Sequence, residues 1–196
     1  MRNYMCALAF VILMGGLLGS SVFAKNKGSR STPNSFLRFK GGVGVSPVSN
    51  VAGTAIVSSA IPPVTTFPEV TRNVVHGVNP PGQIWMIKDL DASVMITGDI
   101  KVKGKGLILG GGNNVGRATG QSVFATLICE AAAPFTEHST TVTGVPLAAN
   151  GDFEIDDVLS GFPIDGCASP MLLIRTAGSG NWFAAGIPDL GGQKDD

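Results

Sequence analysis

The chain has 196 residues, and its 14 Lys and Arg residues are balanced by 14 Asp and Glu residues, so its formal net charge is zero. Only 14% of the residues are charged and 44% are hydrophobic, which argues against intrinsic disorder over most of the chain. The balanced charge also argues against nucleic acid as a partner, because binding to phosphates needs a basic surface. The 27 glycines and 12 prolines follow no collagen period and favour a turn-rich all-β protein of about one domain.

The first residues, 1–24, are predicted to be a signal peptide. An apolar stretch from Met5 to Gly19 follows the basic Arg2, and small and polar residues then lead to Val-Phe-Ala. We expect cleavage after Ala24. The alternative is an uncleaved membrane anchor, but about 15 apolar residues are short for a bilayer that needs about 20. The protein is therefore expected to be secreted or periplasmic, with no membrane span after cleavage.

The rest of the chain divides by composition. Residues 25–35 are polar and are expected to form a flexible leader. Residues 36–72 are rich in Ser, Thr and Pro and are expected to be extended, as an irregular crossing or a linker, with one strand favoured at 36–45. Residues 73–188 are expected to form the compact domain, and residues 189–196 a disordered tail.

Residues 89–105 alternate between apolar and polar side chains, which predicts a hairpin with one buried face. A two-residue Gly-Asp loop would pair Ile96 with Lys101 and so would place lysines on the apolar face. A three-residue loop at 97–99, which pairs Ile96 with Ile100, keeps the apolar side chains together, and we expect this register.

A second hairpin is predicted around a three-residue loop at 149–151, with Leu147 opposite Phe153. Gly151 occupies the third loop position, where a left-handed backbone is needed. Further strands are expected at 121–129, 171–176 and 182–187. Together with the two hairpins this makes about seven short strands, which is typical of an antiparallel β-sandwich.

Three stretches resemble sequence blocks of a group of uncharacterised secreted bacterial all-β proteins. They are GLILGGGNNVGRATGQSVFATLICEA, GVPLAANGDFEIDDVL and CASPMLLIRTAGSGNWFAAGI, and the resemblance covers about residues 82–187. It implies an exported, compact domain and no particular activity. The stretch NGDFEIDDVL is also similar to the Asp-Gly-x-Phe-x-Ile pattern of transthyretin-like and carboxypeptidase-regulatory-like sandwiches. The expected fold is therefore an antiparallel β-sandwich of the Ig-like or transthyretin-like type.

A glycine-rich stretch at residues 104–120 invites comparison with a phosphate-binding loop. Such a loop needs the N-terminus of a helix after it, whereas a strand is predicted here, so we interpret the stretch as a turn. Loops on rigid sheets often carry function. The candidate ligand-binding residues in this region are therefore Asn113, Asn114, Arg117 and Gln121.

An acidic run resembles a set of calcium ligands and consists of Asp152, Glu154, Asp156 and Asp157. Calcium needs about six to eight oxygens around one point. Alternate residues of a strand lie about 6.6 Å apart, which is too far for three of these carboxylates to share one ion. We favour a solvated strand face and expect no metal and no cofactor.

The two histidines, His76 and His138, lie in no recognisable catalytic motif. The chain has no Gly-x-Ser-x-Gly elbow and no His-Glu-x-x-His pair, so we interpret both as structural or surface residues. A hydrolase remains the alternative, because paired carboxylates are defined by distance in space rather than in sequence. Trp85 lies in an apolar run and is expected in the core, whereas Trp182 follows a glycine-rich turn.

Cys129 and Cys167 are the two cysteines that remain after the predicted signal peptide is removed. Export would place them in an oxidising compartment, and only one intramolecular pairing is then available. We predict a disulfide between them, with a pair of buried free thiols as the alternative.

The expected function is binding. We expect a non-catalytic exported module or a structural component of the envelope or extracellular space. Its partner is expected to be a small polar ligand, a glycan or an envelope protein. The alternative is a small secreted hydrolase with a site based on Asp, Glu or His.

Overall fold

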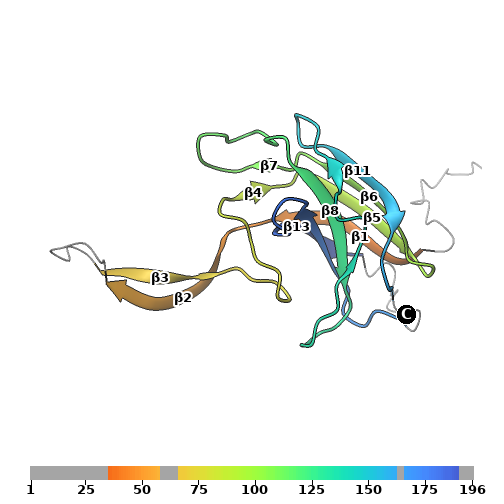
Figure 1. The fold of residues 1–196 in the computed structure, drawn as a ribbon, viewed down its shortest axis with the longest axis horizontal. Helices are drawn as coiled ribbons and strands as arrows, with labels where there is room; N and C mark the ends of the chain where they lie inside the picture. The colour runs from red at the N-terminus through yellow and green to blue at the C-terminus, as the bar shows by residue number, and fades with distance from the viewer. Residues whose placement is uncertain (1–34, 58–65, 163–165, 190–196) are drawn as a thin grey trace, which may run out of the picture. The chain divides into compact units, whose positions relative to one another are not determined.

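The computed structural model describes residues 35–57, 66–162 and 166–189, which form thirteen strands and no helix (Figure 1). The all-β prediction is confirmed. The strands are β1 (Ser35–Gly44), β2 (Val48–Val57), β3 (Thr66–Arg72), β4 (Trp85–Met86), β5 (Asp89–Met95), β6 (Asp99–Lys105), β7 (Ile108–Leu109), β8 (Ser122–Ile128), β9 (His138–Ser139), β10 (Val145–Pro146), β11 (Phe153–Val158), β12 (Met171–Thr176) and β13 (Trp182–Pro188).

Parts of the predicted domain organisation fall outside these ranges. The predicted signal peptide at 1–24 lies there, as do all but the last residue of the predicted leader and all but the first residue of the predicted tail. In the part of the chain that the structure describes, there is no helix long and apolar enough to cross a membrane.

Nine strands form one antiparallel sheet in the order β10-β8-β12-β13-β1-β5-β6-β11, with β9 also paired to β8. The two end strands, β10 and β11, contact each other, so the sheet curls into a nearly closed barrel. The predicted sandwich is corrected accordingly. Its two sheets would have to be separate, whereas β1 pairs with β13 on one side and β5 on the other and so joins both halves.

The seam between β10 and β11 is closed by a few contacts rather than by a ladder. At one end the Ala148 N–H donates to the Asp152 carbonyl over 2.9 Å, and at the other the Ser160 N–H donates to the Ser139 carbonyl over 2.9 Å. Between them lies a small cavity of about 80 Å³, with Asp157 in its wall. The barrel is therefore held more loosely at this seam than elsewhere around the sheet.

The β5–β6 hairpin has the predicted faces but a different register. The buried side chains are Leu90, Ala92, Val94, Ile100 and Val102. Val94, rather than Ile96, pairs with Ile100, and the Ile96 side chain is 55% exposed. The predicted pairing is therefore wrong by two residues. The cause is Gly98, which has φ +88° and takes the left-handed third position of the loop, so that the loop is 96–98 and not 97–99.

The turn at 149–151 is confirmed, and Gly151 has the expected left-handed φ of +82°. A side chain there would clash with the Leu107 backbone, so glycine is needed for packing as well. The strands on either side part after the turn, which differs from the predicted pairing of Leu147 with Phe153. β10 pairs with β8, and β11 pairs with β6, where the ring of Phe153 packs over Gly104.

The three further predicted strands at 121–129, 171–176 and 182–187 correspond to β8, β12 and β13. Two small sheets complete the fold. β2 pairs with β3 within the proline-containing segment, and β4 pairs with β7 (Figure 1). At the base of the β2–β3 pair, the Asn73 side chain donates a 3.0 Å hydrogen bond to the Ser46 carbonyl.

Candidate functional site

An open cleft with a volume of about 370 Å³ lies where the β12–β13 turn meets β4, β7 and the start of β8. Its walls come from segments that are distant in the sequence and that the sheet brings together. The lining residues are Pro81, Gly82, Gln83, Trp85, Leu109, Asn114, Thr119, Gln121, Thr176, Ser179, Asn181 and Phe183.

The floor of the cleft is aromatic. The rings of Trp85 and Phe183 stack with their centroids 4.0 Å apart and an angle of 13° between their planes. Each residue is only 4% exposed, as expected for Trp85 from its apolar surroundings in the sequence. The β4 backbone comes close enough for this packing because residue 44 is glycine, since a Cβ there would collide with the Trp85 carbonyl.

The rim is polar and uncharged. Four side-chain amides and three hydroxyls line the cleft, and none of its lining residues is Asp, Glu, Lys, Arg or His. The Thr176 hydroxyl donates a 3.1 Å hydrogen bond to Oε1 of Gln121, which ties the end of β12 to the start of β8. Because Oε1 accepts this bond, the Nε2 end of the Gln121 amide serves as a donor.

The glycine-rich stretch forms a turn, as interpreted from the sequence. The Leu109 N–H donates to the Arg117 carbonyl over 3.0 Å, and the Gly116 N–H donates to the Leu109 carbonyl over 2.8 Å. Gly112 and Gly116 have φ values of +77° and +79°, which only glycine adopts without strain. The strand β8 follows, so this turn lacks the helix N-terminus that a phosphate-binding loop requires.

Thr119 is strained. Its φ is +55°, and a β-branched residue rarely adopts this left-handed conformation. Backbone strain of this kind costs on the order of 1–3 kcal/mol and tends to occur at functional positions. Thr119 lies in the wall of the cleft, so the strained position belongs to the candidate site.

The four predicted ligand-binding residues separate into two pairs. Asn114 and Gln121 line the cleft, whereas Asn113 and Arg117 are exposed on the same loop outside the lining. The structure therefore brings half of the predicted set to one site. Their role in binding stays a prediction.

Sequence reasoning missed the lining residues of two other segments, notably Gln83, Ser179 and Asn181. Both segments combine turn-forming glycines with short polar side chains, in Pro-Pro-Gly-Gln and Gly-Ser-Gly-Asn, and that combination was the available signal. Their proximity to Gln121 depends on pairing between strands that are far apart in the chain.

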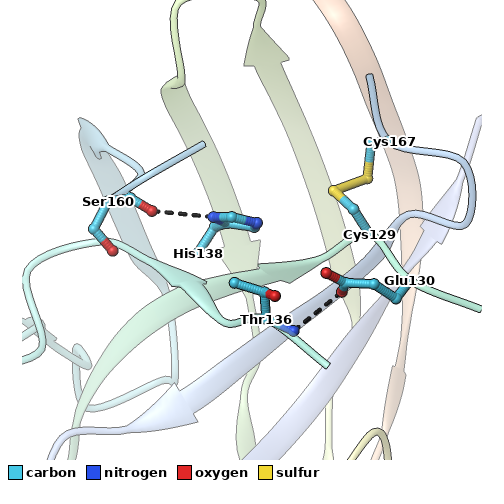
Figure 2. The surroundings of a disulfide bond; sticks show 6 residues. All are labelled: Cys129, Glu130, Thr136, His138, Ser160 and Cys167. Atoms are coloured by element: carbon cyan, nitrogen blue, oxygen red, sulfur yellow. Dashed lines mark hydrogen bonds between the residues drawn. A yellow bond between two sulfur atoms is a disulfide. The ribbon is translucent and has the colours of Figure 1, made fainter. Parts of the chain in front are cut away.

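The predicted cysteine pair is found at disulfide distance (Figure 2). The Cα atoms of Cys129 and Cys167 lie 4.6 Å apart, within the range of about 4.4–6.8 Å for bridged cysteines. The Ser169 N–H donates to the Cys129 carbonyl over 3.1 Å, which also holds the two segments together. Next to the pair, the Glu130 carboxylate accepts a 3.1 Å hydrogen bond from the Thr136 N–H, which lowers the pKa of Glu130.

Neither histidine forms a catalytic arrangement within the described ranges. His138 is 5% exposed, and its Nδ1 lies 3.1 Å from the backbone carbonyl of Ser160 (Figure 2). His76 packs its ring against Phe135 with the centroids 4.5 Å apart. No acidic side chain hydrogen-bonds either ring in the part of the chain described, so no Ser-His-acid geometry supports the hydrolase alternative.

The acidic run is spread along β11 and already has protein partners. Glu154 and Asp156 pair with Lys103 and Lys101 across β6, at 3.2 and 2.6 Å, and all four side chains are about two-thirds exposed. This confirms a solvated strand face.

The two remaining carboxylates accept hydrogen bonds from backbone N–H groups. Asp157 binds those of Thr141 and Val158, and Asp152 binds that of Gly106. Over the ranges described, no group of three or more His, Cys, Asp or Glu side chains is close enough to hold a metal ion.

No family model matches this chain, and neither a curated protein nor a solved structure is significantly similar to it. The resemblances to secreted bacterial proteins and to transthyretin-like sandwiches therefore stay predictions. A function has to be inferred from the geometry of the cleft.

Proposed function

We propose that this protein is an exported, non-catalytic binding module and that its cleft takes a neutral glycan. The observation that carries the proposal is the composition of the cleft. Four amides and three hydroxyls surround a floor formed by Trp85, Phe183 and Leu109, without a charged side chain in the lining.

The chemistry of this lining fits a sugar. Each sugar hydroxyl both donates and accepts hydrogen bonds, and an Asn or Gln amide offers a donor and an acceptor side by side. An anionic or cationic ligand would leave its charge without a partner in the cleft, which is unfavourable on desolvation. The apolar floor suits the carbon-bound faces of a sugar ring, and the volume of about 370 Å³ falls within the usual range of about 300–1,000 Å³ for small-ligand sites.

The cleft is largely preformed, which favours binding. Trp85 and Phe183 are buried and stacked, and Gln121 is held by its hydrogen bond to Thr176. A ligand that enters a preformed site orders fewer side chains, and less binding free energy is lost.

Export is part of the proposal. The predicted signal peptide at 1–24 supports a secreted or periplasmic location. The Cys129–Cys167 pair at disulfide distance also supports it, because disulfides persist mainly in oxidising compartments. The resemblance to secreted bacterial proteins points the same way, and an envelope or extracellular glycan would be available in such a location.

The test is a thermal melting screen on the processed chain, Lys25–Asp196, with neutral oligosaccharides of glucose, mannose, galactose and N-acetylglucosamine. Sialylated and sulfated oligosaccharides serve as charged counterparts. A ligand that binds only the folded state raises the melting temperature in a concentration-dependent manner. We expect such a shift with at least one neutral oligosaccharide and a smaller one with its charged counterpart. The proposal would be contradicted if only the charged compounds raised the melting temperature. It would also be contradicted if no compound raised it at millimolar concentration.

A further inference from the structure

We infer that Arg175 is a positioning residue for the cleft: it holds the β12–β13 turn, and with it Ser179 and Asn181, in place at the rim. This inference rests on the proposed function. Arg175 is not itself a lining residue, and it acts through the turn.

Arg175 is placed behind the cleft by the alternation of side chains along β12. Neighbouring residues of a strand point to opposite faces of the sheet. Thr176 points toward the cleft, where its hydroxyl binds Gln121. The Arg175 side chain therefore lies on the other face, and it is only 12% exposed.

The guanidinium group is fixed from several directions. Its Nη1 lies 2.5 Å from the carboxylate of Glu137 and 3.4 Å from the hydroxyl of Thr126. The group also lies over the ring of Phe124, 5.3 Å from the centroid, at cation–π distance. These contacts anchor the arginine to β8 and to the residue before β9, independently of the turn.

A separate donor of the guanidinium group reaches the turn. Nε of Arg175 donates a 2.7 Å hydrogen bond to the carbonyl of Gly180, which lies between the two rim residues Ser179 and Asn181. Gly180 has φ +69°, and its N–H donates back to the Thr176 carbonyl over 2.9 Å. Because Gly180 is directly bonded to both rim residues, fixing its carbonyl restrains the backbone that carries both side chains.

Arginine is required for this arrangement because its donors are spread over a rigid, planar fork. One edge can bind Glu137 while Nε binds Gly180. A lysine keeps the positive charge but has a single nitrogen on a flexible stem, so it cannot hold both partners in this geometry. The structure therefore assigns the role to the guanidinium fork rather than to the charge.

The experiment compares the processed wild-type chain with Arg175→Lys and with the control Lys103→Arg in the exposed Lys103–Glu154 pair. Hydrogen exchange of backbone amides is measured by NMR without ligand. We expect Arg175→Lys to raise the exchange rates of the Gly180 and Thr176 amides, which donate to the carbonyls of Thr176 and Asn181, by about tenfold, as for the loss of one charge-assisted hydrogen bond, with strands β5 and β6 unchanged. The control should change neither.

The second readout is affinity. For the neutral oligosaccharide that gives the largest melting shift with wild type, Arg175→Lys should raise Kd by about threefold to tenfold while the melting temperature without ligand changes little. Unchanged exchange in the turn would overturn the inference, and so would faster exchange with an unchanged Kd. If wild type binds no oligosaccharide, the proposed function fails, but the exchange rates still decide whether Arg175 holds the turn.

A second variant covers the case in which Arg175→Lys does not fold. Glu137→Gln removes the charge at the more exposed end of the contact, where Glu137 is 46% exposed, and leaves Arg175 in place. We expect exchange of the Gly180 and Thr176 amides to increase here too, by less than in Arg175→Lys, because the bond from Nε to Gly180 persists. No increase in this variant would count against the inference.

Discussion

Trp85 and Phe183 are joined both by their rings and through the backbone of Val45. The rings stack 4.0 Å apart, the Val45 N–H donates to the Phe183 carbonyl over 3.0 Å, and the Trp85 N–H donates to the Val45 carbonyl over 3.1 Å. Val45 directly follows β1, so this contact connects β13, β1 and β4. The floor of the cleft is thus part of the barrel framework and moves with it.

Replacing Trp85 by alanine is therefore expected to weaken both stability and binding. Loss of a buried aromatic side chain typically costs about 3–5 kcal/mol, through lost burial and the cavity that remains. Urea unfolding measures this change. The control is Ile96→Ala, because Ile96 is 55% exposed and should change stability by less than about 0.5 kcal/mol. Equal effects of the two substitutions would show that Trp85 is not an anchor of the fold.

In contrast to Trp85→Ala, replacement of Thr119 by glycine is not expected to destabilise the protein. Thr119→Gly removes a side chain from a left-handed position with φ +55°, so the relief of strain offsets the entropy that glycine loses on folding. We expect the free energy of unfolding to stay the same or to rise by up to about 1 kcal/mol, while affinity for the oligosaccharide falls. A clear loss of stability with unchanged affinity would show that the Thr119 side chain serves the fold and not the site.

The cysteine pair predicts the absence of free thiols in the processed protein. A thiol reagent added after denaturation without reductant should label neither Cys129 nor Cys167. Replacement of both by serine should lower stability by about 4 kcal/mol, the chain-entropy value for a separation of 38 residues. Labelling of two thiols in the unreduced, processed protein would refute the bridge.

The seam of the barrel predicts a dependence of stability on pH. Hydrogen bonds from the N–H groups of Thr141 and Val158 hold the pKa of the Asp157 carboxyl below its usual value. A lowered folded-state pKa stabilises the protein above the unfolded-state pKa of about 3.9, and this stabilisation is lost as the pH falls through the folded-state pKa.

Asp157→Asn should accordingly be less stable than wild type at pH 6–7, and the difference should shrink below about pH 4. Chemical denaturation of both proteins from pH 2.5 to 7 tests this. A difference that is constant across the range would mean that the charge of Asp157 contributes nothing at the seam.

Calcium is expected to have little effect. Glu154 and Asp156 already pair with lysines on β6, and neither they nor the neighbouring carboxylates converge on one point. Melting temperatures in millimolar calcium and in chelator should agree to within a degree or two. A larger shift would mean that the acidic run binds the ion after rearrangement.

The local pattern of apolar, polar and turn-forming residues was enough to predict the strands and turns, but not the exact register in which the strands pair. The alternation from Leu90 to Val94 predicted one buried face, and the left-handed Gly151 was predicted from its turn. The β5–β6 register was missed because a loop that places Gly98 third, instead of Asp99, keeps the same side chains inside. Alternation of side chains between the two faces of a strand cannot distinguish two registers that differ by two residues, because both keep the same side chains on the buried face.

Closure of the barrel depends on contacts that leave no local signal. The pairing of Phe39 with Ala92 joins β1 to β5 across a sequence separation of 53 residues, and nothing near either residue indicates it. The same holds for the cleft. Asn114 and Gln121 were found because their loop is rich in polar residues, whereas Asn181 joins them through the long-range pairing of β8, β12 and β13.

The central claim, that the cleft binds a neutral glycan, is tested most directly by two neighbouring residues of one loop. Asn114 lines the cleft and Asn113 does not, although both are exposed asparagines. Isothermal titration with the best neutral oligosaccharide should show a Kd that rises by about tenfold in Asn114→Ala, a loss typical of one hydrogen bond to a ligand, and stays within about twofold of wild type in Asn113→Ala. Equal losses in both variants, or none in Asn114→Ala, would contradict binding in this cleft.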